Sequence, residues 1–106
     1  MTPAALADTT ERWGTRMLRL AASFPSLAVK LPGYPRANWD AEAFAAWVRT
    51  AGLCSGARHA ACFVLFVWNP EVRWAAGRFD LRRATGVWDR AHCEAFAAWA
   101  RDPWWP

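Results

Sequence analysis

The sequence predicts a compact all-α domain of four long helices and a short fifth one. Apolar and aromatic side chains recur three and four positions apart over several segments, which is the spacing of one helix face. Prolines and glycines separate these segments, and Asn, Asp or Ser stands where most of them begin. With 106 residues, nine Trp and six Phe, the chain has enough large side chains for one hydrophobic core. We therefore expect residues 1–106 to form a single helical domain.

The first expected helix starts near the N-terminus and ends before Pro25, because the residue before a proline disfavours helical geometry. Arg12, Arg16 and Arg19 follow one another at helical spacing, so they form a basic ridge along one flank. We name these three residues the Arg ridge. Such a ridge is usually a solvated face, although it could also follow phosphates. The apolar positions of this helix are Leu6, Trp13, Met17, Leu20 and Phe24.

Residues 26–38 are expected to form a loop, because Pro32 and Pro35 remove backbone donors and Gly33 lies between them. The loop carries Tyr34, the only tyrosine. Two interpretations stay open: a contact loop for another molecule, or a rigid connector that lays Tyr34 over the core.

A second long helix is expected from Asp40 to about Ala51, with Gly52 at the position that favours a left-handed residue. Its sequence EAFAAWVR at 42–49 returns as EAFAAWAR at 94–101. The two copies stand at different distances from a preceding Trp-Asp pair, so we favour convergence on one packing pattern over duplication. Both segments should present similar Phe and Trp faces, which could pack against each other.

Residues 56–68 admit two interpretations. The run CFVLFVW is rich in β-branched and aromatic residues, which favours a buried strand. Ala and other apolar residues also recur at helical spacing, and Asn69-Pro70 is a natural helix end. We favour a buried helix preceded by a capping Ser55. The alternative is an α+β fold with a short sheet around residues 60–68.

The C-terminal part predicts a short helix, Leu81 to Thr85, capped by Asp80 and interrupted by Gly86. A terminal helix then begins near Asp89 and carries an aromatic stripe. Pro103 ends it, and Trp104 and Trp105 follow. The core expected from all segments consists of Trp13, Met17, Leu20, Phe44, Trp47, Ala61, Val64, Leu65, Trp68, Trp88, Phe96 and Trp99.

No cofactor or metal site is expected. The spacings of Cys54, Cys62 and Cys93 with the two histidines match no zinc knuckle or ribbon. An odd number of scattered cysteines indicates a reducing compartment, and no signal peptide is visible, so we expect a cytoplasmic protein. Catalysis would need His92 in a concave pocket with a second titratable group within hydrogen-bond reach. We favour a non-catalytic role.

The surplus of aromatic residues predicts a small adaptor protein that binds another protein or its own copy. The abundance of Ala, Arg and Trp is typical of a GC-rich bacterial genome. The net charge of +4 is dispersed, so nucleic-acid binding is the alternative function. The expected interaction anchors are Tyr34, Arg36, Arg101, Trp104 and Trp105. The nucleic-acid alternative would use Arg12, Arg16, Arg19, Arg82 and Arg83.

Overall fold

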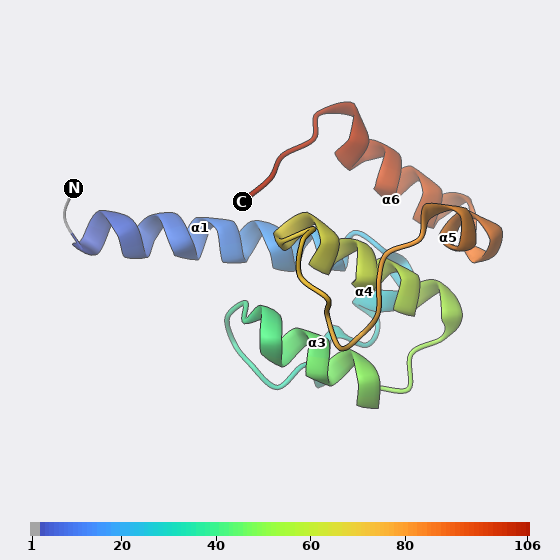
Figure 1. The fold of residues 1–106 in the computed structure, drawn as a ribbon, viewed down its shortest axis with the longest axis horizontal. Coiled ribbons are helices and arrows are strands. Elements are labelled where there is room, and N and C mark those ends of the chain that lie inside the picture. Colours follow the sequence, from blue (N-terminus) through green and yellow to red (C-terminus); the bar gives the residue numbers. More distant parts are fainter. Residues whose placement is uncertain (1–2) are drawn as a thin grey trace.

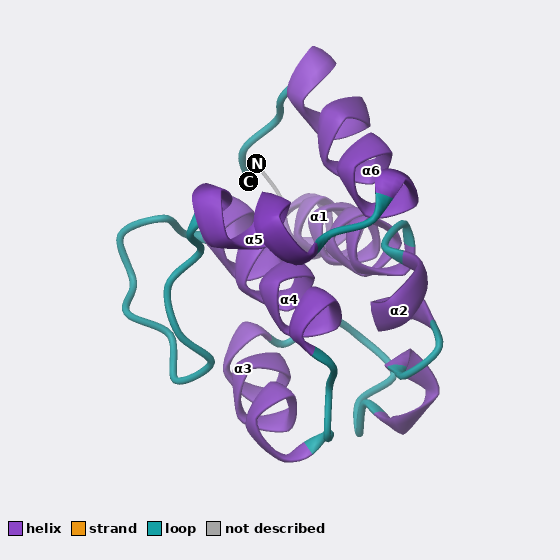
Figure 2. Ribbon diagram, turned by 90° about the vertical axis from the view of Figure 1, so that its right-hand side faces the viewer, coloured by secondary structure: helices purple, strands orange, loops and turns teal. Residues whose placement is uncertain are grey.

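The computed structural model describes residues 3–106, with side chains from Arg12 onward. The described chain is entirely helical and forms a compact globule, as the sequence predicted, with no strand among those residues (Figures 1 and 2). The strand alternative for residues 60–68 is wrong, because this segment lies inside a helix. The elements are α1 (Pro3–Ala22), α2 (Pro25–Ala28), the 3₁₀ turn η1 (Leu31–Gly33), α3 (Ala41–Thr50), α4 (Ser55–Trp68), α5 (Leu81–Val87) and α6 (Arg90–Arg101).

Helix α4 is the centre of the fold, and α1, α2, α3 and α5 all contact it. Phe63, Val64 and Leu65 are completely buried although they follow one another in the sequence. A helix that is apolar on all sides needs neighbours on all sides. The surrounding helices provide them, which explains why strand-like residues adopt helical structure here.

Aspartates begin three of the helices, as expected. Asp40 Oδ1 accepts a hydrogen bond from the Ala43 N–H at 3.0 Å, and Asp80 and Asp89 cap α5 and α6 in the same way. Gly52 has a φ of 65° directly after α3, which is the left-handed conformation predicted for it. These helix ends therefore follow from local sequence.

Three local expectations need correction. Residues 26–38 are not an irregular loop throughout, because they hold the end of α2 and the turn η1. Prolines occupy the first turns of both elements, where the missing N–H has no helical partner to lose. Gly86 does not interrupt α5, which continues to Val87. The residue before α4 is Cys54, not Ser55.

The two similar segments lie on opposite sides of α4, since α3 and α6 flank it in both views (Figures 1 and 2). They therefore do not pack against each other. Phe44 of α3 contacts the Trp39 ring with centroids 4.9 Å apart, whereas Phe96 of α6 contacts Phe63 at 5.1 Å. Each copy uses its Phe on a different part of the core.

Most of the expected core is buried, but four aromatic residues are only partly so. The surface helices α1 and α6 cover one side of the core and leave part of their own aromatic faces to solvent. None of the helices within residues 3–106 contains an apolar stretch of the length that spanning a lipid bilayer requires. Buried members of the expected core are Met17, Leu20, Phe44, Trp47, Ala61, Val64, Leu65 and Trp88, and partly buried ones are Trp13, Trp68, Phe96 and Trp99.

Candidate functional site

The C-terminal tail folds back from the end of α6 toward α1 (Figure 1). The Trp104 ring lies 5.8 Å from the Trp13 ring. The Arg16 guanidinium carbon lies 4.3 Å from the centroid of Trp104 and 4.9 Å from that of Trp13. A cation over an aromatic face is worth about 0.5–1 kcal/mol at an exposed site. Trp104 thus connects the end of the chain to the Arg ridge.

Trp105 is the more accessible of the two tail indoles, with 48% of its surface exposed. Its ring stands edge-on to Trp99 at 5.1 Å and to Phe66 at 5.7 Å. The Trp99 Nε1–H donates a hydrogen bond to the Trp104 carbonyl oxygen at 3.3 Å. The tail is therefore held by its own chain, and about half of Trp105 remains open to solvent.

A groove of about 530 Å³ runs between α1 and α6. Its floor is mostly apolar and includes Leu20, Ala95 and Trp99. Arg16 and Arg19 stand on the α1 side, and Trp104 also lines the groove. We name this the α1/α6 groove. Its remaining lining residues are Ser23, Ala91, Glu94 and Ala98.

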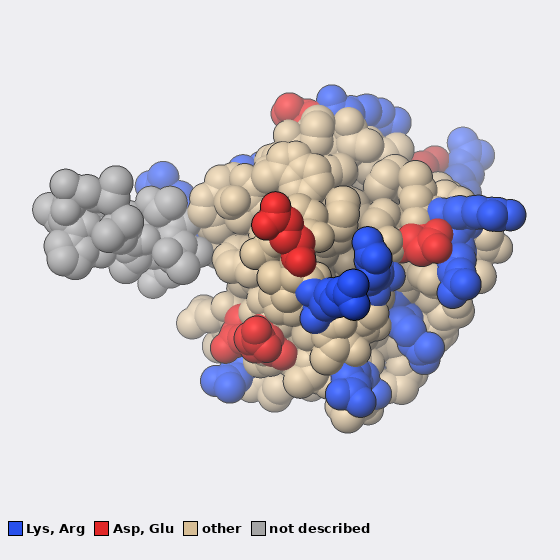
Figure 3. Space-filling view, viewed as in Figure 1, with Lys and Arg blue, Asp and Glu red and all other residues tan. Residues whose placement is uncertain are grey.

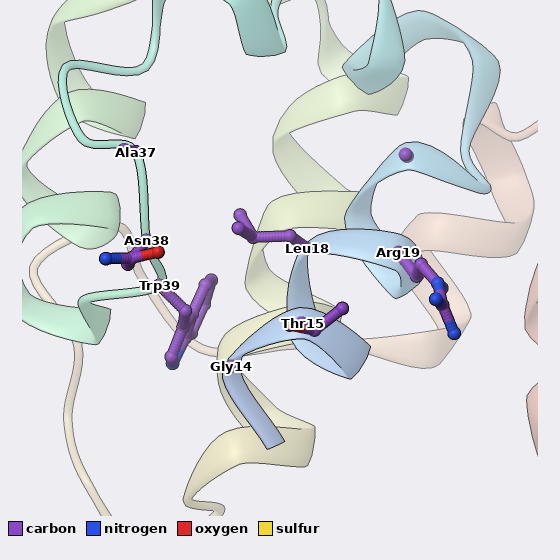
Figure 4. Close-up of a pocket in the computed structure, with 8 residues that line it drawn as sticks. Gly14, Thr15, Leu18, Arg19, Ala37, Asn38 and Trp39 are labelled. Carbon is purple, nitrogen blue, oxygen red and sulfur yellow. The ribbon is translucent and has the colours of Figure 1, made fainter. Parts of the chain in front are cut away.

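A second hollow of about 610 Å³ lies between α1 and residues 37–39 (Figure 4). Figure 4 shows the Leu18 side chain extending toward the segment that carries Trp39, and Arg19 extending to the other side of α1. A Cβ at Gly14 would lie 3.1 Å from the Trp39 Cβ, so glycine permits this close approach. The Trp39 Nε1 is buried and has no hydrogen-bond partner among the described residues.

The Arg ridge borders both hollows, because Arg19 lines each of them. Arg12, Arg16 and Arg19 are exposed. Within residues 12–106 no ion pair is formed by these three side chains. Figure 3 shows Lys and Arg spread over the displayed face with Asp and Glu among them, so that face has no continuous basic surface.

The other predicted residues are not gathered around this groove. Tyr34 is buried, with 8% exposure, and its hydroxyl donates to the Asn38 carbonyl oxygen and accepts from the Asp40 N–H, each at 3.0 Å. It therefore does not offer its ring to a partner, and of the two interpretations of its loop the connector matches the structure. Arg36 and Arg101 are exposed.

Arg82 and Arg83 lie on α5, toward the end of the molecule away from the first turns of α1 (Figures 1 and 2). Arg83 also pairs with Asp80 at 3.8 Å. The structure does not bring these two arginines together with the Arg ridge. The residues proposed for nucleic-acid binding are thus divided between two separate surfaces.

A chain of hydrogen bonds connects α6 to α2 outside the groove. The Asp89 Oδ1 lies 2.6 Å from the His92 Nδ1, and the His92 Nε2 lies 2.6 Å from the Ser26 Oγ. His92 is 5% exposed. Its side chain and backbone N–H donate to Asp89 and hold the pKa of that carboxyl below its usual range. Asp89 lies three residues before His92, within one helical turn, whereas Ser26 is 66 residues away and was not expected from the sequence.

Cys54 stands next to this chain at the beginning of α4. The N–H of Ala57 and the Ser26 hydroxyl lower the pKa of its thiol, and the thiol is exposed. Burial raises the pKa of the Cys62 thiol instead. Among the described residues, no group of three or more His, Cys, Asp or Glu side chains is placed to hold a metal ion.

No protein-family model matches the chain, and no curated protein or solved structure matches it significantly.

Proposed function

We propose that this protein is an adaptor that binds an acidic, amphipathic segment of a partner protein in the α1/α6 groove. The observation that carries the proposal is the combination of an apolar floor with Arg16 and Arg19 on one side. Apolar side chains of the segment would cover Leu20 and Trp99. Its carboxylates would pair with the two arginines, which is the usual complementarity of charge across an interface.

The occupant is expected to be acidic because the chain has thirteen basic and nine acidic residues. Glu94, the acidic residue in the groove, already accepts a hydrogen bond from Arg90 at 3.0 Å. A positively charged surface attracts a negatively charged partner and repels a second copy of itself. Trp104 also lines the groove and adds an aromatic anchor to it, since Trp and Arg commonly anchor interfaces.

Binding can be measured with a fluorescein-labelled synthetic helical peptide that carries Glu on one face and Leu and Trp on the other. Arg19→Glu should raise the Kd at least about tenfold, equivalent to about 1.4 kcal/mol. Arg19 is preferred over Arg16 because Arg16 also holds Trp104. Arg36→Glu is the matched control: it makes the same charge change at an exposed position outside the groove, and its Kd should stay within about twofold of wild type.

Two results would contradict this function. In one, both charge reversals weaken binding equally, or a peptide with Lys in place of Glu binds as well. In the other, a labelled DNA duplex binds more tightly than the peptide and its affinity falls steeply with salt, which is the signature of phosphate contacts. That second result would favour the nucleic-acid alternative through Arg12, Arg16 and Arg19.

A further inference from the structure

We propose that Ser26, His92 and Asp89 form an acyl-transfer site with the Ser26 Oγ as its nucleophile. A nucleophile, a base and a group that orients the base stand in line, with 2.6 Å between Oγ and Nε2 and 2.6 Å between Nδ1 and Oδ1. This order of hydroxyl, imidazole and carboxylate is what activates a serine for attack on a carbonyl carbon. The site is separate from the α1/α6 groove.

The hydrogen bonds determine which nitrogen of His92 carries the proton. The Asp89 carboxylate can only accept, so Nδ1–H donates to it. The Ser26 backbone N–H can only donate, and it points at Nε2 at 3.3 Å. Nε2 is therefore the unprotonated nitrogen, and its one in-plane lone pair is shared between the Ser26 N–H at 3.3 Å and the closer Ser26 hydroxyl at 2.6 Å.

The beginning of α4 lies next to the nucleophile. The first N–H bonded within α4 is that of Arg58, which donates to the Cys54 carbonyl oxygen at 2.9 Å. The N–H groups before it have no partner within α4. A Cβ built on Gly56 would lie 3.9 Å from the Ser26 Oγ, so this helix start is close to the hydroxyl.

The reaction balances with these groups alone. The Ser26 Oγ forms a bond to the carbonyl carbon of an ester while its proton passes to the His92 Nε2. The bond to the leaving alcohol then breaks, and that alcohol takes the proton from His92. Water repeats the sequence on the acyl-serine and releases the acid. Neither Ser26 nor His92 lines a hollow described above, so the site lacks the enclosing pocket that is typical of enzymes, and the substrate expected is a small ester that reaches Ser26 directly from solvent.

The test is covalent labelling of the full chain with a fluorophosphonate probe, followed by peptide mass spectrometry to locate the adduct. Wild type should be labelled at Ser26, and Ser26→Ala should lose the label. Ser55→Ala is the matched control, because Ser55 is an exposed serine that belongs neither to the triad nor to the α1/α6 groove. Cys54→Ala should also retain the label. The rate of p-nitrophenyl acetate hydrolysis should likewise be lost in Ser26→Ala and retained in the control variants.

Asp89→Asn separates catalysis from a structural role, because the asparagine oxygen can still cap α6. Asp89 is a positioning residue that acts through His92. In Asp89→Asn the labelling rate at Ser26 should therefore fall at least about a hundredfold. Far-UV circular dichroism should show the same helical content as wild type. Absence of labelling at Ser26 in folded wild type would overturn the proposal. A labelling rate in Asp89→Asn equal to that of wild type would also overturn the proposal, because that result is expected if these hydrogen bonds only hold α2 and α6 together.

Discussion

Replacing Trp104 by Ala tests whether the tail stabilises the fold. The change removes an aromatic contact with Trp13 at 5.8 Å and the cation–π contact with Arg16 at 4.3 Å. These contribute about 0.5–1.5 kcal/mol and about 0.5–1 kcal/mol respectively. The hydrogen bond from Trp99 goes to a backbone oxygen, which alanine keeps. We expect the free energy of unfolding to fall by about 1–2.5 kcal/mol.

The measurement is urea unfolding followed by far-UV circular dichroism, analysed by linear extrapolation. A double-mutant cycle with Arg16→Ala isolates the cation–π contact, for which we expect a coupling energy of about 0.5–1 kcal/mol. Trp105→Ala is the comparison within the same tail. A zero coupling energy together with unchanged stability in Trp104→Ala would refute the reasoning, because the tail would then not be held against α1 in solution.

Two further predictions concern titratable groups. Hydrogen bonds from His92 lower the pKa of Asp89 in the folded state. The charge of Asp89 should therefore stabilise the fold fully above the ordinary aspartate pKa of about 3.9. This stabilisation should be lost as the pH falls through the lowered pKa of the folded state. Thermal unfolding of wild type and Asp89→Asn over this pH range should show their Tm difference shrinking toward low pH, and a constant difference would contradict the assignment. Iodoacetamide should alkylate Cys54 well before Cys62, since one thiol is exposed with a lowered pKa and the other is buried with a raised one. Site-resolved mass spectrometry measures this order, and equal rates would show that α4 opens readily.

Local sequence was sufficient to predict where most helices begin and end. An aspartate that accepts a hydrogen bond three residues onward acts within a single turn, so the starts set by Asp40 and Asp89 needed no knowledge of the rest of the chain. The short elements α2 and η1 were missed because a proline excludes a helix interior and permits a first turn equally well. Pattern alone could not separate these two cases.

The helix at residues 55–68 depended on its surroundings. Its central residues suit a strand as well as a buried helix, and the decision comes from helices on every side of α4. Degree of burial was similarly undetermined for Trp13 and Trp99. Both lie on apolar helix faces, yet both remain partly exposed, and Trp99 does so because it lines the groove that separates α1 from α6.

The amphipathic helices α1, α3 and α6, the aspartate caps of α3, α5 and α6, and the basic ridge on α1 follow from the sequence alone, because all of these depend on residues within a turn or two of one another. Which distant side chains meet depends on the tertiary packing. It placed Trp104 against Arg16, buried Tyr34, and set Ser26 beside His92 across 66 residues. Contacts of this kind arise when helices bury their apolar faces together, and no local spacing encodes them.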